Sequence, residues 1–340
     1  MSDVPSSWAR PTLTRRGFLG AVSAGTVIAF GCRRRPYDRS HFVLPSESAV
    51  ALLPAADYGR DLADVIYRGL QLTPVAVAGR RVLLKPNVVE HRTGSAINTD
   101  PAMVAGAAEA LLRAGAREVI VAEGPGHRRD CEYLLEATGL LDVLSQLRLR
   151  FVDLNHDDVK PVTLKSQFTG LPSMQLPVEL LRSDVVVSMP KLKTHHWAGM
   201  TCGMKNLFGV VPGGVYGWPK NVLHWTGIDN AIIDLAATIR PSLTIVDAIT
   251  SMEGDGPIMG RARKTGFIAM GTDVVTVDAT CARAIGIDPY RLPYIEEAAR
   301  FLGNADAARI RHRGESPGRY AFEFELIESM KPVRARPTAG

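Results

Sequence analysis

The segment from residue 190 to residue 224 holds the densest collection of side chains that can do chemistry. Its histidines and lysines, His195 and Lys205 among them, are interspersed with glycines, and the segment shows little helical or strand periodicity. Lysine ammonium groups attract carboxylates and phosphates, imidazoles transfer protons or ligate metals, and glycines let the backbone approach a ligand closely. We therefore expect a ligand-binding site in this segment, and a glycine-rich lid without chemistry is the alternative.

Polar side chains also follow several predicted strands at the point where each strand ends. Lys85 and Asn87 follow one strand, His127 follows a second and His156 follows a third. Ligands of open parallel sheets bind beyond the carboxyl ends of the strands. The lysines and the asparagine at these ends are therefore expected to bind an anionic substrate: Lys85, Asn87, Lys191 and Lys193. Any one of these side chains taken alone is more often simply solvated.

Two carboxylates in the second half of the chain are further candidates. Glu253 lies in a glycine-rich loop after the strand predicted at 243–247, and Asp278 precedes a predicted helix. Carboxylates in such positions can bind a hard cation or act as a base. The alternative for Glu253 is a turn residue, and the alternative for Asp278 is the N-cap of the helix.

Strand and helix patterns alternate from about residue 41 onward, which is typical of an α/β protein with parallel sheets. Helices are expected at 61–70, 101–114, 132–147, 232–239 and 278–285, and buried strands at 81–85, 118–122, 150–154, 184–188, 243–247 and 266–270. We predict two Rossmann-like lobes with mainly parallel sheets and an active-site-like cleft between them. The N-terminal α/β domain is expected over 41–230, the C-terminal α/β domain over 231–330, and a disordered tail over 331–340.

Residues 1–40 are predicted to be an export signal and linker. Arg15 and Arg16 lie in a twin-arginine motif that precedes a short apolar run, Phe18–Phe30. This order predicts that the twin-arginine translocase is a partner, and that the protein resides in the periplasm or on the outer face of the cytoplasmic membrane. A chance arginine pair before a core helix is the alternative.

Membrane anchoring through the N-terminus stays open. Cys32 follows small residues, as in a degenerate lipoprotein cleavage site, and this order favours lipid anchoring. The arginines at 33–35 resist transfer across a membrane and favour an uncleaved anchor or ordinary processing instead.

The composition excludes several classes of protein. A mean hydropathy of +0.03 over 340 residues, with no long uncharged apolar run, excludes a polytopic membrane protein. The net charge is +5, but aromatic residues make up only 6% and no basic stretch is interleaved with them, so nucleic-acid binding is not supported. The four cysteines form no C-x-x-C pair, so the chain carries no iron–sulfur motif. The basic excess fits a cleft for a small anionic ligand, with a solvated basic surface as the alternative.

Several short motifs, in their order along the chain, resemble the family called domain of unknown function 362. They are Lys85-Pro86-Asn87, Pro190-Lys191-x-Lys193-Thr194-His195, Gly203-x-Lys205-Asn206-x-Phe208-Gly209, Met252-Glu253-Gly254-x-Gly256-Pro257 and Asp273-x-x-x-x-Asp278. Other members of that family are sometimes fused to ferredoxin-type iron–sulfur modules. The family itself implies little about activity.

A more distant similarity is to the nickel-pincer lactate racemase family. It rests on the order of Gly126-His127, Asn155-His156-Asp157, His195-x-x-Ala198-Gly199, Gly203-x-Lys205, Pro212-Gly213 and His224. This resemblance implies that Lys205 carries a covalent nicotinate-derived cofactor and that His224 ligates nickel, while His127 and His195 transfer protons. A simpler divalent-metal site would use His224 with Glu253 or Asp278. The sequence departs from the family at Cys202, which replaces the first glycine of a Gly-Gly pair.

Two classes of function follow from these features. The first is an exported, cofactor- or metal-dependent enzyme that acts on a small hydroxy-acid-like anion, as a racemase or epimerase does. The second is a non-enzymatic periplasmic protein that binds a metal or a carboxylate, or that serves as a redox partner of iron–sulfur proteins. Only an enzyme should lose turnover while keeping ligand affinity when His127 or His195 is replaced.

Overall fold

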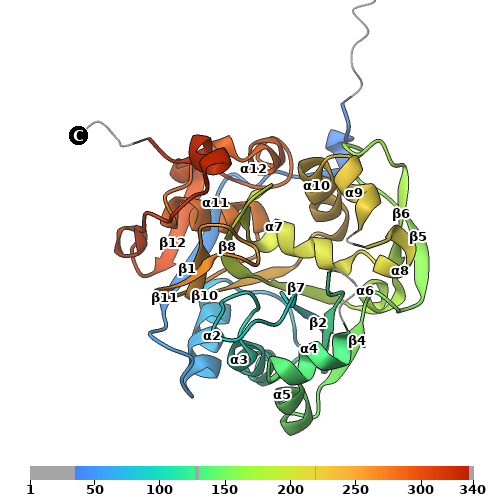
Figure 1. The fold of residues 1–340 in the computed structure, drawn as a ribbon, viewed down its shortest axis with the longest axis vertical. Coiled ribbons are helices and arrows are strands. Elements are labelled where there is room, and N and C mark those ends of the chain that lie inside the picture. Colours follow the sequence, from blue (N-terminus) through green and yellow to red (C-terminus); the bar gives the residue numbers. More distant parts are fainter. Residues whose placement is uncertain (1–34, 127–129, 219, 337–340) are drawn as a thin grey trace, which may run out of the picture. The chain divides into compact units, whose positions relative to one another are not determined.

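The structure, a computed structural model, describes residues 35–126, 130–218 and 220–336 (Figure 1). The twin-arginine motif, Cys32 and His127 lie outside the described residues. Residues Pro36–Gly340 cluster as one compact unit. Within the part of the chain that is described, no helix is long and apolar enough to cross a membrane.

A ten-stranded sheet forms the centre of the described residues. Its strands are β1 (Ser48–Pro54), β2 (Arg81–Pro86), β3 (Glu118–Glu123), β4 (Arg150–Asp153), β7 (Val185–Met189), β8 (Lys191–His195), β9 (Gly199–Thr201), β10 (Leu243–Glu253), β11 (Arg261–Gly271) and β12 (Ile310–Gly314). The spatial order is β12-β1-β11-β10-β7-β2-β3-β4, with β8 paired to β10 and β9 paired to β8. Pairing is mainly parallel, except that β11 runs antiparallel to β1 and β10, and that β8 and β9 form a hairpin. A separate antiparallel pair consists of β5 (Val159–Thr163) and β6 (Ser173–Pro177).

Helices cover both faces of the sheet (Figure 1). The α-helices are α2 (Leu62–Leu72), α3 (Pro101–Arg113), α4 (Cys131–Ala137), α5 (Leu140–Gln146), α6 (Val178–Arg182), α7 (Gly203–Asn206), α8 (Gly213–Tyr216), α9 (Asn221–Trp225), α10 (Ile228–Ile239), α11 (Val274–Ala284) and α12 (Pro293–Ala298). Short 3-10 helices are η1 (Arg39–His41), η2 (Leu207–Val210), η3 (Pro289–Arg291), η4 (Ala307–Arg309), η5 (Pro317–Tyr320) and η6 (Glu328–Val333).

Alternate residues of the central strands belong to two separate hydrophobic cores. Val82 and Leu84 of β2 pack in one core with α2, α3, α4 and α5, whereas Leu83 packs in the other with α7, α10, α11 and α12. Successive side chains of a strand point to opposite faces, and a sheet covered on both faces needs apolar residues at every position. This explains the continuous apolar runs from which the buried strands were predicted.

The predicted α/β fold with a mainly parallel sheet is confirmed, but one large central sheet takes the place of the two expected lobes. The strands β10 and β11, which follow residue 230 in the sequence, lie between β1 and β7. The expected boundary near residue 230 therefore falls inside one compact unit. The tail expected from residue 331 begins in η6, and Arg334 bridges to Ile287, while residues 337–340 lie outside the described residues.

Two predicted helices differ in their limits. The helix expected at 132–147 is divided into α4 and α5 at Gly139, whose φ of 77° places it in the left-handed region. The helix expected from Asp278 begins instead at Val274, because Asp273 caps it by accepting a hydrogen bond from the Thr276 amide. Asp278 is therefore inside α11, and the N-cap interpretation of this residue is wrong.

Candidate functional site

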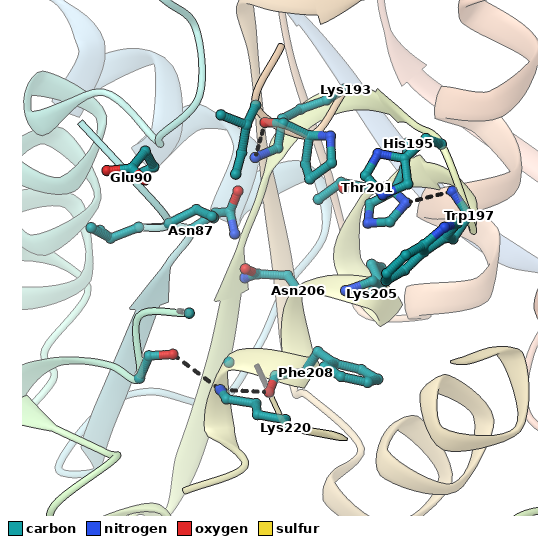
Figure 2. A pocket seen from close by; sticks show the side chains of 18 of the residues that line it. Asn87, Glu90, Lys193, His195, Trp197, Thr201, Lys205, Asn206, Phe208 and Lys220 are labelled. Carbon is teal, nitrogen blue, oxygen red and sulfur yellow. Dashed lines mark hydrogen bonds between the residues drawn. The ribbon is translucent and has the colours of Figure 1, made fainter. Parts of the chain in front are cut away.

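A cavity of about 580 Å³ opens at the carboxyl ends of β2 and β3, between these ends and the β8–β9 hairpin. We call it the lysine cavity, because three lysines line it: Lys193 from β8, Lys205 from α7, and Lys220 just before α9. Figure 2 shows Lys205 and His195 on one side of the cavity, with Asn87 and Glu90 on the other. Its position agrees with the rule that open parallel sheets bind ligands at strand carboxyl ends.

A buried ion pair lies at the base of the lysine cavity. The Nζ of Lys85 is 2.8 Å from the carboxylate of Glu123, and both side chains are almost completely buried. Glu123 also accepts hydrogen bonds from the amides of Val88 and Gly124, and Lys85 donates to Asn206. Burial lowers the pKa of Lys85, and the charge of Glu123 opposes that shift. Lys85, predicted to bind substrate, therefore already has a carboxylate partner, and it does not line the cavity.

Two glycines of the motif around Lys205 are required by close packing. A Cβ at Gly209 would overlap both the Glu123 carboxylate and the Lys85 ammonium. A Cβ at Gly203 would lie 2.9 Å from Oδ1 of Asp278 and 2.8 Å from Cγ2 of Val274. Real Cβ atoms do not approach other heavy atoms this closely. The two glycines thus let the segment that carries Lys205 pack against the ion pair and against α11.

Lys193 is fully buried and has no carboxylate partner among the described residues. Its ammonium donates to the carbonyl of Ile97 at 2.7 Å and to that of Pro257 at 3.5 Å. Burial places the pKa of Lys193 well below its usual value, and the positive charges of Lys205 and Lys191 add to the effect. Carbonyl dipoles only partly compensate a buried cation.

Lys205 is the least constrained of the cavity lysines. Its Nζ lies 4.2 Å from the centroid of the Phe208 ring, a cation–π contact. No described residue forms a hydrogen bond or ion pair with this ammonium. Burial, with the charge of Lys85 second, lowers the pKa of Lys205 to about 8. At neutral pH this amine is therefore close to losing its proton.

Lys220 lines the cavity, although nothing in its sequence context predicted this. Its Nζ donates to the carbonyls of Gly124 and Phe208, each at 3.1 Å, as the dashed lines in Figure 2 show. Burial lowers the pKa of Lys220 to about 7. Its backbone φ of 67° is uncommon for a residue other than glycine. This conformation is visible only in the structure, since the surrounding sequence has neither strand nor helix periodicity.

His195 presents a defined proton to the cavity. Its Nδ1 accepts hydrogen bonds from the amides of Trp197 at 3.0 Å and Ala198 at 3.2 Å, so the ring proton lies on Nε2. Burial, followed by the charge of Lys205, holds the pKa of His195 well below its usual value. His195 is therefore a neutral imidazole whose Nε2–H can donate a hydrogen bond.

Asn87 also lines the cavity, and its Oδ1 is buried without a hydrogen-bond partner among the described residues. Buried polar atoms normally have partners. This unmatched acceptor suits a ligand that brings a hydrogen-bond donor.

The described residues do not bring the predicted metal ligands together. His224 lines the cavity and donates from Nδ1 to the Lys220 carbonyl, whereas neither Glu253 nor Asp278 lines it. The carboxylate of Glu253 accepts hydrogen bonds from Arg261, Arg263 and the amide of Glu325. No group of three or more His, Cys, Asp or Glu side chains that could hold a metal exists in the described part of the chain.

Asp278 supports α7 instead of binding a metal. Its two carboxylate oxygens accept hydrogen bonds from the amides of Gly203 at 2.7 Å and Met204 at 3.0 Å. These amides lie at the first turn of α7 and need an acceptor from outside the helix. Asp278 is thus a positioning residue for the helix that carries Lys205.

Lys191, predicted to bind substrate, is also engaged elsewhere. Its Nζ lies 2.5 Å from Asp247 and donates to the hydroxyl of Tyr58 at 2.8 Å. The register of β8 against β10 shifts between Lys191, opposite Asp247, and Lys193, opposite Met252. This irregularity explains why two lysines of the same short strand have different partners.

The family profile described as Domain of unknown function (DUF362) matches residues 82–283. The chain belongs to this family. A thylakoid-associated protein of Synechocystis sp. is 30% identical over 263 residues, which cover 75% of this chain and 78% of that protein. The family expected from the motifs is therefore confirmed.

Two solved structures are similar at low sequence identity. The lactate racemase apoprotein of Thermoanaerobacterium thermosaccharolyticum aligns with a TM-score of 0.43 and 13% identity, over 72% of this chain and 59% of that one. A protein of Thermotoga maritima aligns with a TM-score of 0.33 and 11% identity, over 65% of this chain and 57% of that one. The chain thus spans less than two thirds of the length of either protein.

Replacing Asp278 by asparagine should cost more stability at pH 5 than at pH 8. Burial raises the pKa of Asp278 to about 7, so the folded state binds its proton more tightly than the unfolded state, whose aspartate has a pKa near 3.9. The carboxyl therefore contributes stability at low pH that is lost as the pH rises through about 7, at about 1.4 kcal/mol for each pKa unit.

Urea unfolding of wild type and Asp278→Asn at both pH values measures this difference. Asp273→Asn, which alters the N-cap of the same helix, gives the baseline for losing a carboxylate from α11. An equal cost of Asp278→Asn at both pH values would contradict a proton-binding carboxyl at this position.

Proposed function

We propose that the lysine cavity binds a small carboxylate or similar anion, and that His195 promotes proton transfer at it. The observation that supports this proposal is the gathering of three lysines around one cavity. Lys193, Lys205 and Lys220 line one cavity without a carboxylate partner among the described residues, and the buried carboxylate there, Glu123, already pairs with Lys85.

The energetics favour an anion over a bare cationic cavity. Burying an unpaired ammonium is costly, and a protein can reduce the cost by releasing the proton or by binding a negative charge. The lowered pKa values of Lys205 and Lys220 reflect the first route in the empty cavity. A bound anion supplies the second route, and its charge would raise both pKa values again.

His195 gives the proposal its enzymatic part. Because two amides fix Nδ1, the Nε2–H of His195 keeps a defined direction and can polarise a substrate oxygen by a hydrogen bond, which favours proton transfer at the neighbouring carbon. A hydroxy acid or oxo acid held by lysines would place its carbon and oxygen atoms within the same cavity as this proton.

Anion affinity should fall as the pH rises from 7 to 9. Binding recharges Lys220 and Lys205, whose pKa values are about 7 and about 8 in the empty cavity, so protons are taken up with the anion. The stabilisation should follow RT ln(1 + [L]/Kd), or about 2.7 kcal/mol at a hundredfold excess over Kd.

Calorimetric titration with lactate and oxalate at pH 7 and pH 9, in buffers of different ionisation enthalpy, measures both affinity and proton uptake. Lys193→Met should weaken binding, while Lys264→Met, which removes an exposed lysine of β11, is the matched control. Binding that is independent of pH, or equal in Lys193→Met, would leave the cavity lysines without the proposed role.

His195→Gln should abolish proton exchange at a bound substrate while changing anion affinity only a few-fold. The side chain of glutamine keeps a polar group but cannot act as an acid or base near neutral pH. Small carboxylates incubated with the wild type in heavy water are examined by NMR for exchange of the hydrogen beside the carboxylate. Anion binding without exchange in the wild type would favour the non-enzymatic binding protein.

A second candidate function is the racemase-like one that the order of motifs implies. Its support is that Lys205 and His224 both line the cavity and both contact Phe208, the ring centroids of His224 and Phe208 lying 5.3 Å apart. Lys205 would hold the covalent cofactor and His224 would contribute one metal ligand. A metal there needs its other ligands from the cofactor, which would supply hydride chemistry for a hydroxy acid.

We also propose that the protein is exported by the twin-arginine route. The support is the motif at Arg15 and Arg16 with its following apolar run. Changing both arginines to lysine should retain the protein in the cytoplasm, because this machinery requires the arginine pair. Cell fractionation with immunoblotting measures the distribution, and Arg33→Lys with Arg34→Lys is the matched control. An unchanged distribution of the Arg15/Arg16 variant would contradict the proposal.

A further inference from the structure

We propose that Lys205 is a nucleophilic amine that forms an imine with the carbonyl carbon of a 2-oxo acid bound in the lysine cavity. This inference deepens the proposed function and rests on it, since the carboxylate of the 2-oxo acid is the anion that the cavity binds. It excludes the covalent cofactor of the second candidate, because both would use the same nitrogen atom.

The contacts of the lysines single out Lys205. Lys85 and Lys191 pair with carboxylates, and Lys193 and Lys220 are each held by two backbone carbonyls. The Lys205 ammonium has only the face of Phe208 beside it among the described residues. An amine that donates no hydrogen bond keeps its lone pair and its side-chain freedom available for attack on a ligand.

The neighbouring β8–β9 hairpin supplies a place for the carboxylate. Lys193 and Thr201 are directly opposite each other in the register of the hairpin, and both line the cavity. Residues opposite in an antiparallel pair have their side chains on the same face, so Lys193 and Thr201 project from the same side of the hairpin. Lys205 lines the same cavity as Lys193 and Thr201.

A ligand that uses both the cavity lysines and the Lys205 amine needs a carboxylate and an electrophilic carbonyl in one small molecule. In a 2-oxo acid the carboxylate carbon and the carbonyl carbon share one bond, so a single ligand brings both groups into this cavity. A 2-hydroxy acid would occupy the same place but has no electrophilic carbon. Lys205 can therefore form a covalent bond with a 2-oxo acid but not with a 2-hydroxy acid, whereas the other lysines contribute only charge to the binding of either.

The protonation state of Lys205 is suited to nucleophilic attack. Attack requires the neutral amine, and an ordinary lysine with a pKa near 10.4 is almost entirely charged at neutral pH. Burial and the charge of Lys85 bring the pKa of Lys205 to about 8. About a tenth of the amine is then neutral at pH 7, a fraction about two hundredfold larger than for an ordinary lysine. Desolvation beside other cations is a recognised way to activate a lysine.

Imine formation at Lys205 requires two steps, addition of the amine and loss of water. The amine lone pair bonds to the carbonyl carbon as the C=O π electrons move to oxygen, and the nitrogen gives up a proton as the oxygen gains one. The resulting carbinolamine then loses its hydroxyl as water when that oxygen is protonated again, and the nitrogen lone pair forms the C=N bond as the nitrogen releases its second proton. The sum is amine plus carbonyl giving imine plus water, with no change of oxidation state.

His195 and Asn87 are suited to these steps. His195 lines the cavity, and its Nε2–H can donate a hydrogen bond to the departing oxygen. The unpartnered Oδ1 of Asn87 can accept a hydrogen bond from the carbinolamine hydroxyl or from the released water. The Oδ1 of Asn87, which the anion proposal leaves unused, thus acquires a role.

The test is reductive trapping on the full chain as purified. Pyruvate with cyanoborohydride should add one reduced adduct per chain, and peptide mapping should place it at Lys205. Lys205→Arg keeps a positive charge but cannot form an imine, so the trapped fraction should fall about tenfold or more. Lys264→Arg is the matched control on an exposed lysine and should leave trapping unchanged, and lactate in place of pyruvate should give no adduct.

The outcomes separate this inference from the proposed function. Anion binding without trapping overturns the imine but leaves the anion site standing, whereas the absence of both removes both proposals. An adduct that maps to Lys193 or Lys220 overturns the assignment to Lys205. A purified chain whose Lys205 already carries a covalent group overturns the imine in favour of the racemase-like candidate. Mapping in the wild type decides the site even if Lys205→Arg fails to fold.

Discussion

The buried ion pair between Lys85 and Glu123 holds together the elements that build the lysine cavity. The carboxylate of Glu123 accepts hydrogen bonds from the Lys85 ammonium and from two backbone amides at the ends of β2 and β3. The Lys85 ammonium also donates a hydrogen bond to Asn206 at the end of α7. Removing one partner of such a pair leaves an uncompensated buried charge, which costs about 3–5 kcal/mol. The pair also demands glycine at position 209, where any side chain would overlap it. Lys85 forms the ion pair and Gly209 leaves room for it, although 124 positions of the sequence separate the two residues.

The same ion pair explains why the cavity is basic. It occupies the buried carboxylate near the strand ends, so Lys193 and Lys220 are left with backbone carbonyls and Lys205 with an aromatic face. A carbonyl accepts a hydrogen bond from a neutral amine as well as from an ammonium, although the bond from the ammonium is the stronger one. The fold thus fixes the positions of the lysine Nζ atoms. Whether each Nζ is protonated depends on the pH and on the charge of a ligand.

Local signals in the sequence predicted the elements, and long-range pairing determined what the sequence could not reveal. The N-cap at Asp100 followed by Pro101 predicted the start of α3, and apolar runs predicted the strands. The single sheet depends on β10 pairing with β7 and on β11 pairing with β1, and no local pattern encodes that order. Likewise, Lys193, His195, Lys205 and His224 were predicted as site residues and line one cavity, but Lys191 looked no different from Lys193. Lys191 pairs with Asp247, which is 56 residues away in sequence. This pairing distinguishes Lys191, which has a structural role, from Lys193, which lines the cavity.

The choice of lysine over arginine at the cavity has a consequence for how a ligand is held. Arginine would remain charged in a dry cavity at any physiological pH, and the empty protein would bear the full cost of that charge. Lysines with pKa values near 7 and 8 can give up protons when the cavity is empty and regain them when an anion enters. Lys220 connects this charge to the backbone, because its Nζ donates to the carbonyls of Gly124 and Phe208 and its own carbonyl accepts the Nδ1 proton of His224. On the proposed function, an anion that recharges Lys220 would strengthen both of its carbonyl bonds, since hydrogen bonds from a charged donor are stronger than those from a neutral one. The charge of the cavity would then bear on the segment that carries His224.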